Sequence, residues 1–244
     1  MKRSEIVRFL ILRTIGNFLV LFAIFGIFST FGPAIYYEAS YRIVQARGVR
    51  YTVSAPLIPT PVPSNHVGPT PTPGSSSEST GVDNFAQVLG GPTQQILVPK
   101  DSEFSILIPK IGASAKVFPN VDPSNEDEFL PILLKGVAHA KGTVFPGMKG
   151  NIYLFAHSTD NFWDVGRYNA VFYLLKDLSV GDEVVVFFNN KRHDYVIMDT
   201  KVVSPTDISH IVDSQKQNKE QLILQTCWPP GTTWQRLLVF AKPK

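Results

Sequence analysis

The feature that most constrains this chain is a long uncharged apolar stretch near its N-terminus. No charged residue occurs between Thr14 and Tyr37 in the 244-residue sequence. As a helix rising about 1.5 Å per residue, this stretch would extend about 36 Å, which is enough to cross a bilayer. Gly16, Gly26 and Pro33 are tolerated in a spanning helix. We therefore predict a transmembrane helix at 14–37. The alternative, a buried core helix, lacks an adjacent packing partner in the sequence.

Basic residues flank this stretch on both sides. Before it lie Lys2, Arg3, Arg8 and Arg13, and after it lie Arg42, Arg47 and Arg50 together with Glu38. This slight asymmetry favours a cytoplasmic N-terminus. The stretch is longer than the apolar region of a cleaved signal peptide, and no clear cleavage site follows it. We expect an uncleaved signal anchor: a cytoplasmic tail at 1–13, one membrane span, and a C-terminal domain outside the cell.

The composition changes abruptly after the predicted span. We assign residues 38–81 to a juxtamembrane segment and a linker rich in Pro, Ser and Thr. Such a sequence cannot bury a core and favours an extended polyproline II conformation. At about 3.1 Å per residue, its 52–81 part would reach roughly 90 Å. We therefore expect a spacer between the membrane and a domain at 82–244.

Charge and cysteine content exclude several classes of function. Residues 1–81 hold 7 basic and 3 acidic residues, and residues 82–244 hold 16 and 17. The C-terminal domain has no basic excess to attract phosphates, so we expect no nucleic-acid partner. The chain has a single cysteine, which excludes an internal disulfide framework and any multi-cysteine metal site.

Residues 82–244 read mainly as short β-strands between turns, with two helical pieces at 124–135 and 161–175. In the first helical piece we expect a break at Pro131. Many short strands with few helices predict a mostly β fold, a closed barrel of about eight strands. The candidate strands are 104–108, 115–119, 151–156, 183–188, 193–203, 221–226 and 236–241.

Three residues at strand ends could carry chemistry. Cys227 ends an apolar strand, where the backbone is fixed and the thiol faces a turn. A lone cysteine is more often a small buried apolar side chain, but a free thiol outside the membrane is exposed to oxidation. His157 also ends an apolar strand, and a cysteine nucleophile needs such a base. Arg236 opens the last strand, where it could reach solvent or stabilise an oxyanion. His139, in a loop-like stretch, competes with His157.

Taken together, these motifs resemble those of the sortases, membrane-anchored cysteine transpeptidases of Gram-positive and related bacterial envelopes. Residues 223–227, Ile-Leu-Gln-Thr-Cys, are similar to the family's T-L-x-T-C motif, and Arg236 follows on the next strand. Segments 135–158 and 171–188 resemble two further blocks of the family, so the resemblance covers about 100–244. Ile223, Ala156 and the run Trp228-Pro229-Pro230 depart from the family pattern.

The resemblance implies a mechanism and its partners. The Cys227 thiolate would attack a Leu-Pro-x-Thr-Gly-like sorting signal near the C-terminus of a secreted protein, and a thioacyl enzyme would form. An amine of a peptidoglycan precursor or of a pilin would then resolve it. His157 would act as acid and base, and Arg236 would hold the oxyanion. Thr226, His139 and Trp228 are expected substrate contacts.

No cofactor or metal is expected. Some sortases use calcium, but we interpret the acidic run at 126–128 as a helix N-terminus. Two alternatives stay open: an anchored β-domain that binds an envelope component without catalysis, and a sortase-like hydrolase.

Overall fold

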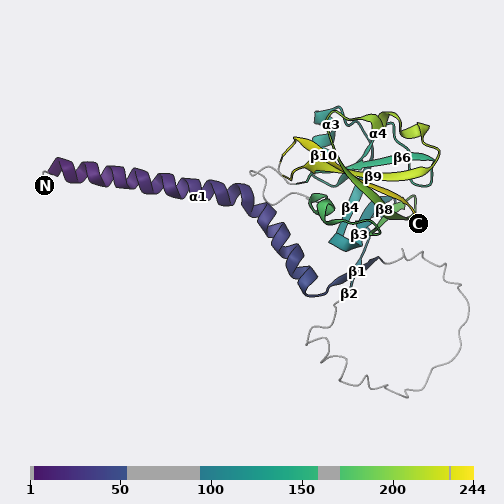
Figure 1. Cartoon of the computed structure of the whole chain (residues 1–244), viewed down its shortest axis with the longest axis horizontal. Coiled ribbons are helices and arrows are strands. Elements are labelled where there is room, and N and C mark those ends of the chain that lie inside the picture. Colours follow the sequence, from purple (N-terminus) through teal and green to yellow (C-terminus); the bar gives the residue numbers. More distant parts are fainter. Residues whose placement is uncertain (1–2, 54–93, 159–170, 231) are drawn as a thin grey trace, which may run out of the picture.

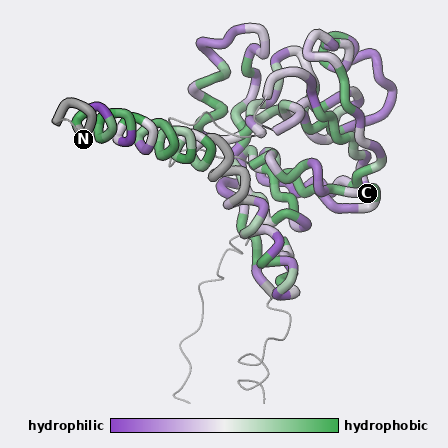
Figure 2. Tube along the Cα trace, turned by 60° about the vertical axis from the view of Figure 1, so that its left-hand side comes forward, coloured by the Kyte–Doolittle hydropathy of each residue, from purple (hydrophilic) through white to green (hydrophobic). Residues whose placement is uncertain are grey.

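One long helix, α1 (Arg3–Ala46), begins the chain and leads to a closed β-barrel (Figure 1). The computed structural model describes residues 3–53, 94–158, 171–230 and 232–244. The apolar part of α1 that is long enough to cross a membrane is Val7–Ser29 (Figure 2), and none of it is buried. The helix thus extends beyond the predicted 14–37 at both ends. The predicted bounds were set by the first charged residue on each side, whereas the helix continues through charged residues such as Arg8 and Arg42.

Eight strands close the barrel in the order β10-β8-β7-β3-β4-β5-β6-β9. All neighbouring pairs are antiparallel except β4 with β5 and β6 with β9. The predicted mostly β barrel of about eight strands is therefore confirmed. The strands are β3 (Phe104–Ile108), β4 (Ala113–Val121), β5 (Val137–Ala140), β6 (Gly150–Phe155), β7 (Glu183–Phe188), β8 (Lys191–Val203), β9 (Glu220–Trp228) and β10 (Gln235–Pro243).

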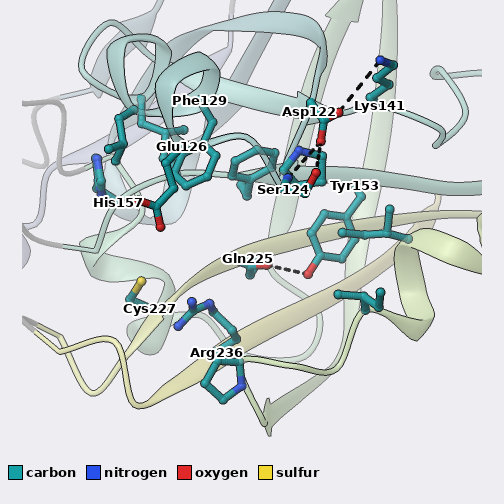
Figure 3. Close-up of a pocket in the computed structure, with 18 of the residues that line it drawn as sticks. Asp122, Ser124, Glu126, Phe129, Lys141, Tyr153, His157, Gln225, Cys227 and Arg236 are labelled. Atoms are coloured by element: carbon teal, nitrogen blue, oxygen red, sulfur yellow. Dashed lines mark hydrogen bonds and ion pairs between the residues drawn. The ribbon is translucent and has the colours of Figure 1, made fainter.

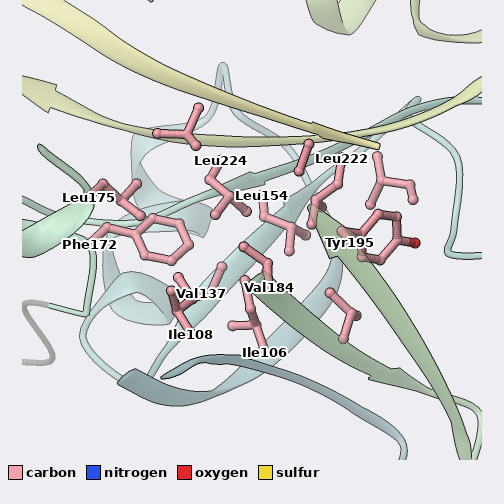
Figure 4. Close-up of a cluster of buried hydrophobic side chains, with 14 of the residues drawn as sticks. Ile106, Ile108, Val137, Leu154, Phe172, Leu175, Val184, Tyr195, Leu222 and Leu224 are labelled. Atoms are coloured by element: carbon pink, nitrogen blue, oxygen red, sulfur yellow. The ribbon is translucent and has the colours of Figure 1, made fainter. Parts of the chain in front are cut away.

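The barrel strands bury both of their faces. Side chains alternate along a strand, so every second residue points into the barrel. In β7, Val184 belongs to the interior core (Figure 4), as does Val186, whereas Val185 and Phe187 belong to a separate cluster on the outside. A continuous apolar run in the sequence therefore indicates a strand that is covered on both of its faces. Two short helices cover one outer face of the barrel, and a pair of short strands covers another.

Two short helices, α3 (Glu126–Leu133) and α4 (Ser209–Val212), contribute side chains to an outer apolar cluster over β6, β9 and β10. The acidic run at 126–128 forms the first turn of α3, as expected. The expected break at Pro131 is wrong, because Pro131 lies inside α3, only two residues before it ends. Of the second predicted helix, 161–175, the part up to residue 170 lies outside the described residues. The remainder overlaps a 3-10 helix, η3 (Tyr173–Asp177).

The opposite outer face is covered by a pair of short parallel strands, β1 (Arg50–Val53) and β2 (Gln94–Leu97). Val53 and Leu97 pack against the fully buried cluster of Leu107, Val185 and Phe187. Most of the predicted linker falls within 54–93 and lies outside the described residues. The strands on either side of that segment pair with each other, so its two ends lie side by side.

The C-terminal end of α1 also contacts the barrel directly. Lys176 Nζ in η3 lies 2.8 Å from Glu38 Oε2, and the Gln45 side-chain amide donates to the Lys110 carbonyl at 3.2 Å. Lys110 belongs to η1 (Pro109–Ile111), a 3-10 helix that follows β3. These two contacts hold the C-terminal part of α1 directly against the barrel.

Candidate active site

The strand register places the three predicted catalytic residues, His157, Cys227 and Arg236, in one row. Arg236 on β10 pairs directly with Cys227 on β9. On the other side of β9, Phe155 of β6 pairs with Gln225, and the Ala156 N–H donates to the Gln225 carbonyl at 3.2 Å. His157 is two residues beyond Phe155, as Cys227 is two beyond Gln225. The row His157, Cys227, Arg236 therefore crosses three neighbouring strands.

Alternation along the strands places this row on the outside of the barrel. Leu154, Leu224 and Leu237 point into the interior core. Phe155 and Leu238 belong to the outer cluster instead. His157, Cys227 and Arg236 follow the outward positions on β6, β9 and β10, and all three line the same cavity (Figure 3).

That cavity has a volume of about 600 Å³ and lies between the outer face of the sheet and the two short helices. Its floor consists of β6, β9 and β10. Its walls are largely apolar, and the row of His157, Cys227 and Arg236 lies at one end (Figure 3). The apolar wall residues are Phe129, Leu130 and Leu133 of α3 and Ile208, Ile211 and Val212 at α4. An apolar cavity with a few polar groups converging at one end is typical of a ligand-binding or active site.

His157 is mostly removed from solvent, and its burial lowers the pKa of its imidazole below the ordinary value of 6.5. Burial has this effect because it disfavours the charged imidazolium. The neutral ring therefore predominates at neutral pH and can accept a proton from a neighbouring thiol. No hydrogen bond within the described part of the chain fixes either ring nitrogen. The Cys227 thiol is free and partly exposed.

One nitrogen of the Arg236 guanidinium is hydrogen-bonded to the backbone. Its Nη1 donates to the backbone carbonyls of Thr233 and Gln235, each at 3.0 Å. These bonds fix the planar group beside Cys227. Within the described residues, its other N–H groups make no hydrogen bond, so they can serve an anionic or carbonyl oxygen in the cavity.

Thr226 has a different environment from the one expected of a substrate contact. Its side chain is fully buried, and its hydroxyl donates to the Ala156 carbonyl at 3.1 Å. This bond ties β9, just before Cys227, to the end of β6, just before His157. Thr226 is not one of the described residues that line the cavity.

His139 and Trp228, the other two expected substrate contacts, are likewise not among the described residues that line the cavity. His139 lies in β5, so its assignment to a loop was wrong: β5 is four residues long, too short to show a periodicity. Its ring is fully buried, stacks on Phe145 with centroids 4.5 Å apart, and contacts Thr143 Oγ1 at 3.0 Å. Trp228 packs against the interior core.

A polar pair on the cavity floor was not predicted from the sequence. The Tyr153 hydroxyl donates to Gln225 Oε1 at 2.7 Å, and both residues line the cavity. The period of two residues along a strand could have identified Gln225, because it lies on the same face as Cys227. Tyr153 has no such local signal, since its pairing depends on the β6–β9 register.

The described residues contain no group of three or more His, Cys, Asp or Glu side chains placed to hold a metal ion. Two of the three described acidic residues that line the cavity, Asp122 and Asp207, are engaged locally, and the third is Glu126. Asp122 accepts hydrogen bonds from Ser124 and lies 3.9 Å from Lys141, and Asp207 accepts from Ser209.

Comparison with known proteins gives a consistent family. The model of a family described as the sortase domain matches residues 106–244. Sortase D of Bacillus subtilis (strain 168) is 31% identical over 138 residues, which are 55% of this chain and 60% of that protein. The chain thus spans less than two thirds of this relative's length.

Two solved structures illustrate the structural similarity. Sortase C from Clostridium perfringens SM101 is 25% identical, covers 57% of this chain and 68% of its own, and gives a TM-score of 0.46. The pilus-related sortase C of Group B Streptococcus is 26% identical, covers 59% and 68%, and gives a TM-score of 0.49.

Proposed function

This chain belongs to the sortase family of cysteine transpeptidases, and we propose that it cleaves a Leu-Pro-x-Thr-Gly-like sorting signal and transfers the acyl part to an amine. The observation that carries the proposal is the row His157, Cys227, Arg236 on three neighbouring strands, facing one cavity. This row combines a nucleophile, a base and an oxyanion partner, as acyl transfer requires.

In the first half of the proposed reaction, neutral His157 accepts the Cys227 proton, and the thiolate adds to the scissile carbonyl. The Arg236 N–H groups stabilise the negative charge that develops on the oxygen. The tetrahedral intermediate collapses, His157 returns the proton to the departing amine, and the C–N bond breaks. A thioester on Cys227 and a free C-terminal fragment result.

In the second half, an amine attacks the thioester and His157 removes its proton. The new amide forms, and the Cys227 thiolate is released and reprotonated. The acceptor is an amine of a peptidoglycan precursor or of a pilin. The exposed apolar helix α1 supports a membrane anchor, and we place the barrel on the extracellular side because the basic residues slightly favour an N-terminus inside.

The test is product analysis of the full chain in detergent with a panel of Leu-Pro-x-Thr-Gly-like peptides and a small amine. We expect the amide product and the released C-terminal fragment in equal amounts. Hydrolysis that persists at high amine would indicate a sortase-like hydrolase. A folded chain with an accessible thiol that cleaves no peptide would overturn the proposal and favour a binding domain.

A further inference from the structure

The Tyr153–Gln225 pair lies on the cavity floor, beside the reactive row. Tyr153 is almost completely buried, and this burial raises the pKa of its hydroxyl. The hydroxyl therefore stays protonated and donates to Gln225 Oε1 at 2.7 Å. Because the amide oxygen is engaged, the Gln225 Nε2 group is directed away from Tyr153. Its two N–H groups make no hydrogen bond within the described part of the chain, and the residue is partly exposed in the cavity.

The spacing of these donors matches an extended peptide. Gln225 and Cys227 are two residues apart on β9, and both face the cavity, so they are separated by about 6.6 Å along the strand. Carbonyl groups that point to the same side of an extended peptide repeat at the same interval. When one carbonyl lies at the Cys227 thiol, the next one on that side lies over Gln225.

The shape of the cavity indicates which part of a substrate occupies the region near Gln225. The acyl part stays bound through both halves of the reaction, whereas the departing amine must leave and be replaced by another. The acyl part therefore requires the enclosed region, and the apolar side chains of α3 and α4 enclose the part of the floor near Gln225 and Tyr153 (Figure 3). The bound peptide then runs parallel to β9, with its C-terminal end toward Cys227.

We propose that Gln225 is a substrate-positioning residue: its Nε2 group donates to the backbone carbonyl two residues before the scissile carbonyl, and Tyr153 orients the amide. This inference rests on the proposed acyl transfer. Such a bond forms in the ground state and in the transition state alike, because it lies away from the reacting atoms. Its loss therefore raises KM and leaves kcat nearly unchanged.

The test uses the full chain and the peptide from the panel that it cleaves, in two forms. One form carries a thioamide at the carbonyl two residues before the scissile one, since sulfur accepts hydrogen bonds more weakly than oxygen. We expect Gln225→Leu to raise KM about tenfold, in line with one lost hydrogen bond. The thioamide should raise KM of the wild type several-fold, but that of Gln225→Leu less than about twofold.

The matched control is Gln221→Leu, the same change on the same strand but outside the cavity lining. This variant should behave as the wild type with both peptides. Tyr153→Phe should give an intermediate KM, because it keeps the amide and removes the group that orients it. Equal thermal melting of the variants establishes that they are folded.

The two possible failures are distinguishable. If the wild type cleaves no peptide, the proposed function fails. If it cleaves both forms and the thioamide penalty is the same in Gln225→Leu as in the wild type, the positioning role is contradicted. A fall in kcat without a change in KM would contradict it as well.

Discussion

At the scale of single residues, the two histidines that the sequence left in competition have different environments. His157 lines the cavity beside Cys227, whereas His139 is sealed inside the barrel wall against Phe145. We expect His157→Ala to lower the rate of peptide cleavage by about 10² to 10⁴, the range for a lost acid or base. His139→Ala should lower stability first, and the folded fraction should keep its cleavage rate. Comparing kcat with the urea unfolding midpoint for both variants separates the two roles.

Burial lowers the pKa of both His139 and His157 below 6.5. The unfolded chain therefore takes up these protons at a higher pH than the folded chain does. Stability contributed by the neutral rings is complete above about pH 6.5 and is lost as the pH falls toward the lowered folded values. We expect the free energy of unfolding to decrease from pH 7.5 to 5.5. His139→Gln should show a smaller decrease, and an equal or larger one would contradict this origin.

At the scale of elements, Thr226 joins the end of β9 to the end of β6 through its bond to the Ala156 carbonyl. Thr226→Val keeps the shape and leaves that carbonyl without its partner, which should cost about 1 to 3 kcal/mol of stability. We also expect slower acylation, because the bond aligns the strands that carry Cys227 and His157. Thr200→Val, an exposed change on β8, is the control, and equal urea midpoints for the two variants would refute the role.

The β1–β2 pair covers an apolar face of the barrel, and adjacent residues of β2 offer a matched test. Leu97 packs on Leu107 and its neighbours, whereas Ile96 is 65% exposed. Leu97→Ser should lower the free energy of unfolding by about 2 kcal/mol, the range for uncovering one apolar side chain. Ile96→Ser should change it by less than about 0.5 kcal/mol. Similar values for both variants would show that β2 does not cover the barrel in solution.

The elements differ in how far local sequence determines them. The apolar runs of β3 and β7 were predicted at 104–108 and 183–188 and have those bounds in the structure. Cys227 and Arg236 could be grouped because both lie at strand ends, but their direct pairing depends on the β9–β10 register. The β1–β2 pair has no local signal: each strand has four residues, and a long Pro-rich segment separates them. Tyr153 and Gln225 likewise meet only through tertiary pairing.

At the scale of the whole molecule, contacts at the end of α1 fix the barrel relative to the membrane helix. Glu38 follows the apolar part, which ends at Ser29, by nine residues, or about 14 Å of helix. Its ion pair with Lys176 holds the barrel close to the end of this apolar part of α1. The predicted spacer lies mostly outside the described residues, and the strands that flank residues 54–93 pair with each other.

A zero-length carbodiimide cross-link tests this arrangement in the full chain in lipid nanodiscs. We expect mass spectrometry to find a Glu38–Lys176 amide, and we expect Lys176→Gln to abolish it. Deletion of residues 60–85 should leave its yield unchanged. A barrel held away from the membrane by the Pro-rich segment would give no such cross-link.

We propose above that one row of residues, His157, Cys227 and Arg236, performs acyl transfer on the outer face of the barrel. Its most direct test is intact mass and peptide mapping of the full chain, quenched in acid within a single turnover of a cleaved peptide. We expect an acyl adduct on Cys227 that is absent from Cys227→Ala and disappears when amine is added before the quench. We also expect Arg236→Ala to form the adduct about 10² to 10³ times more slowly. Peptide cleavage that persists in Cys227→Ala would show that Cys227 is not the nucleophile.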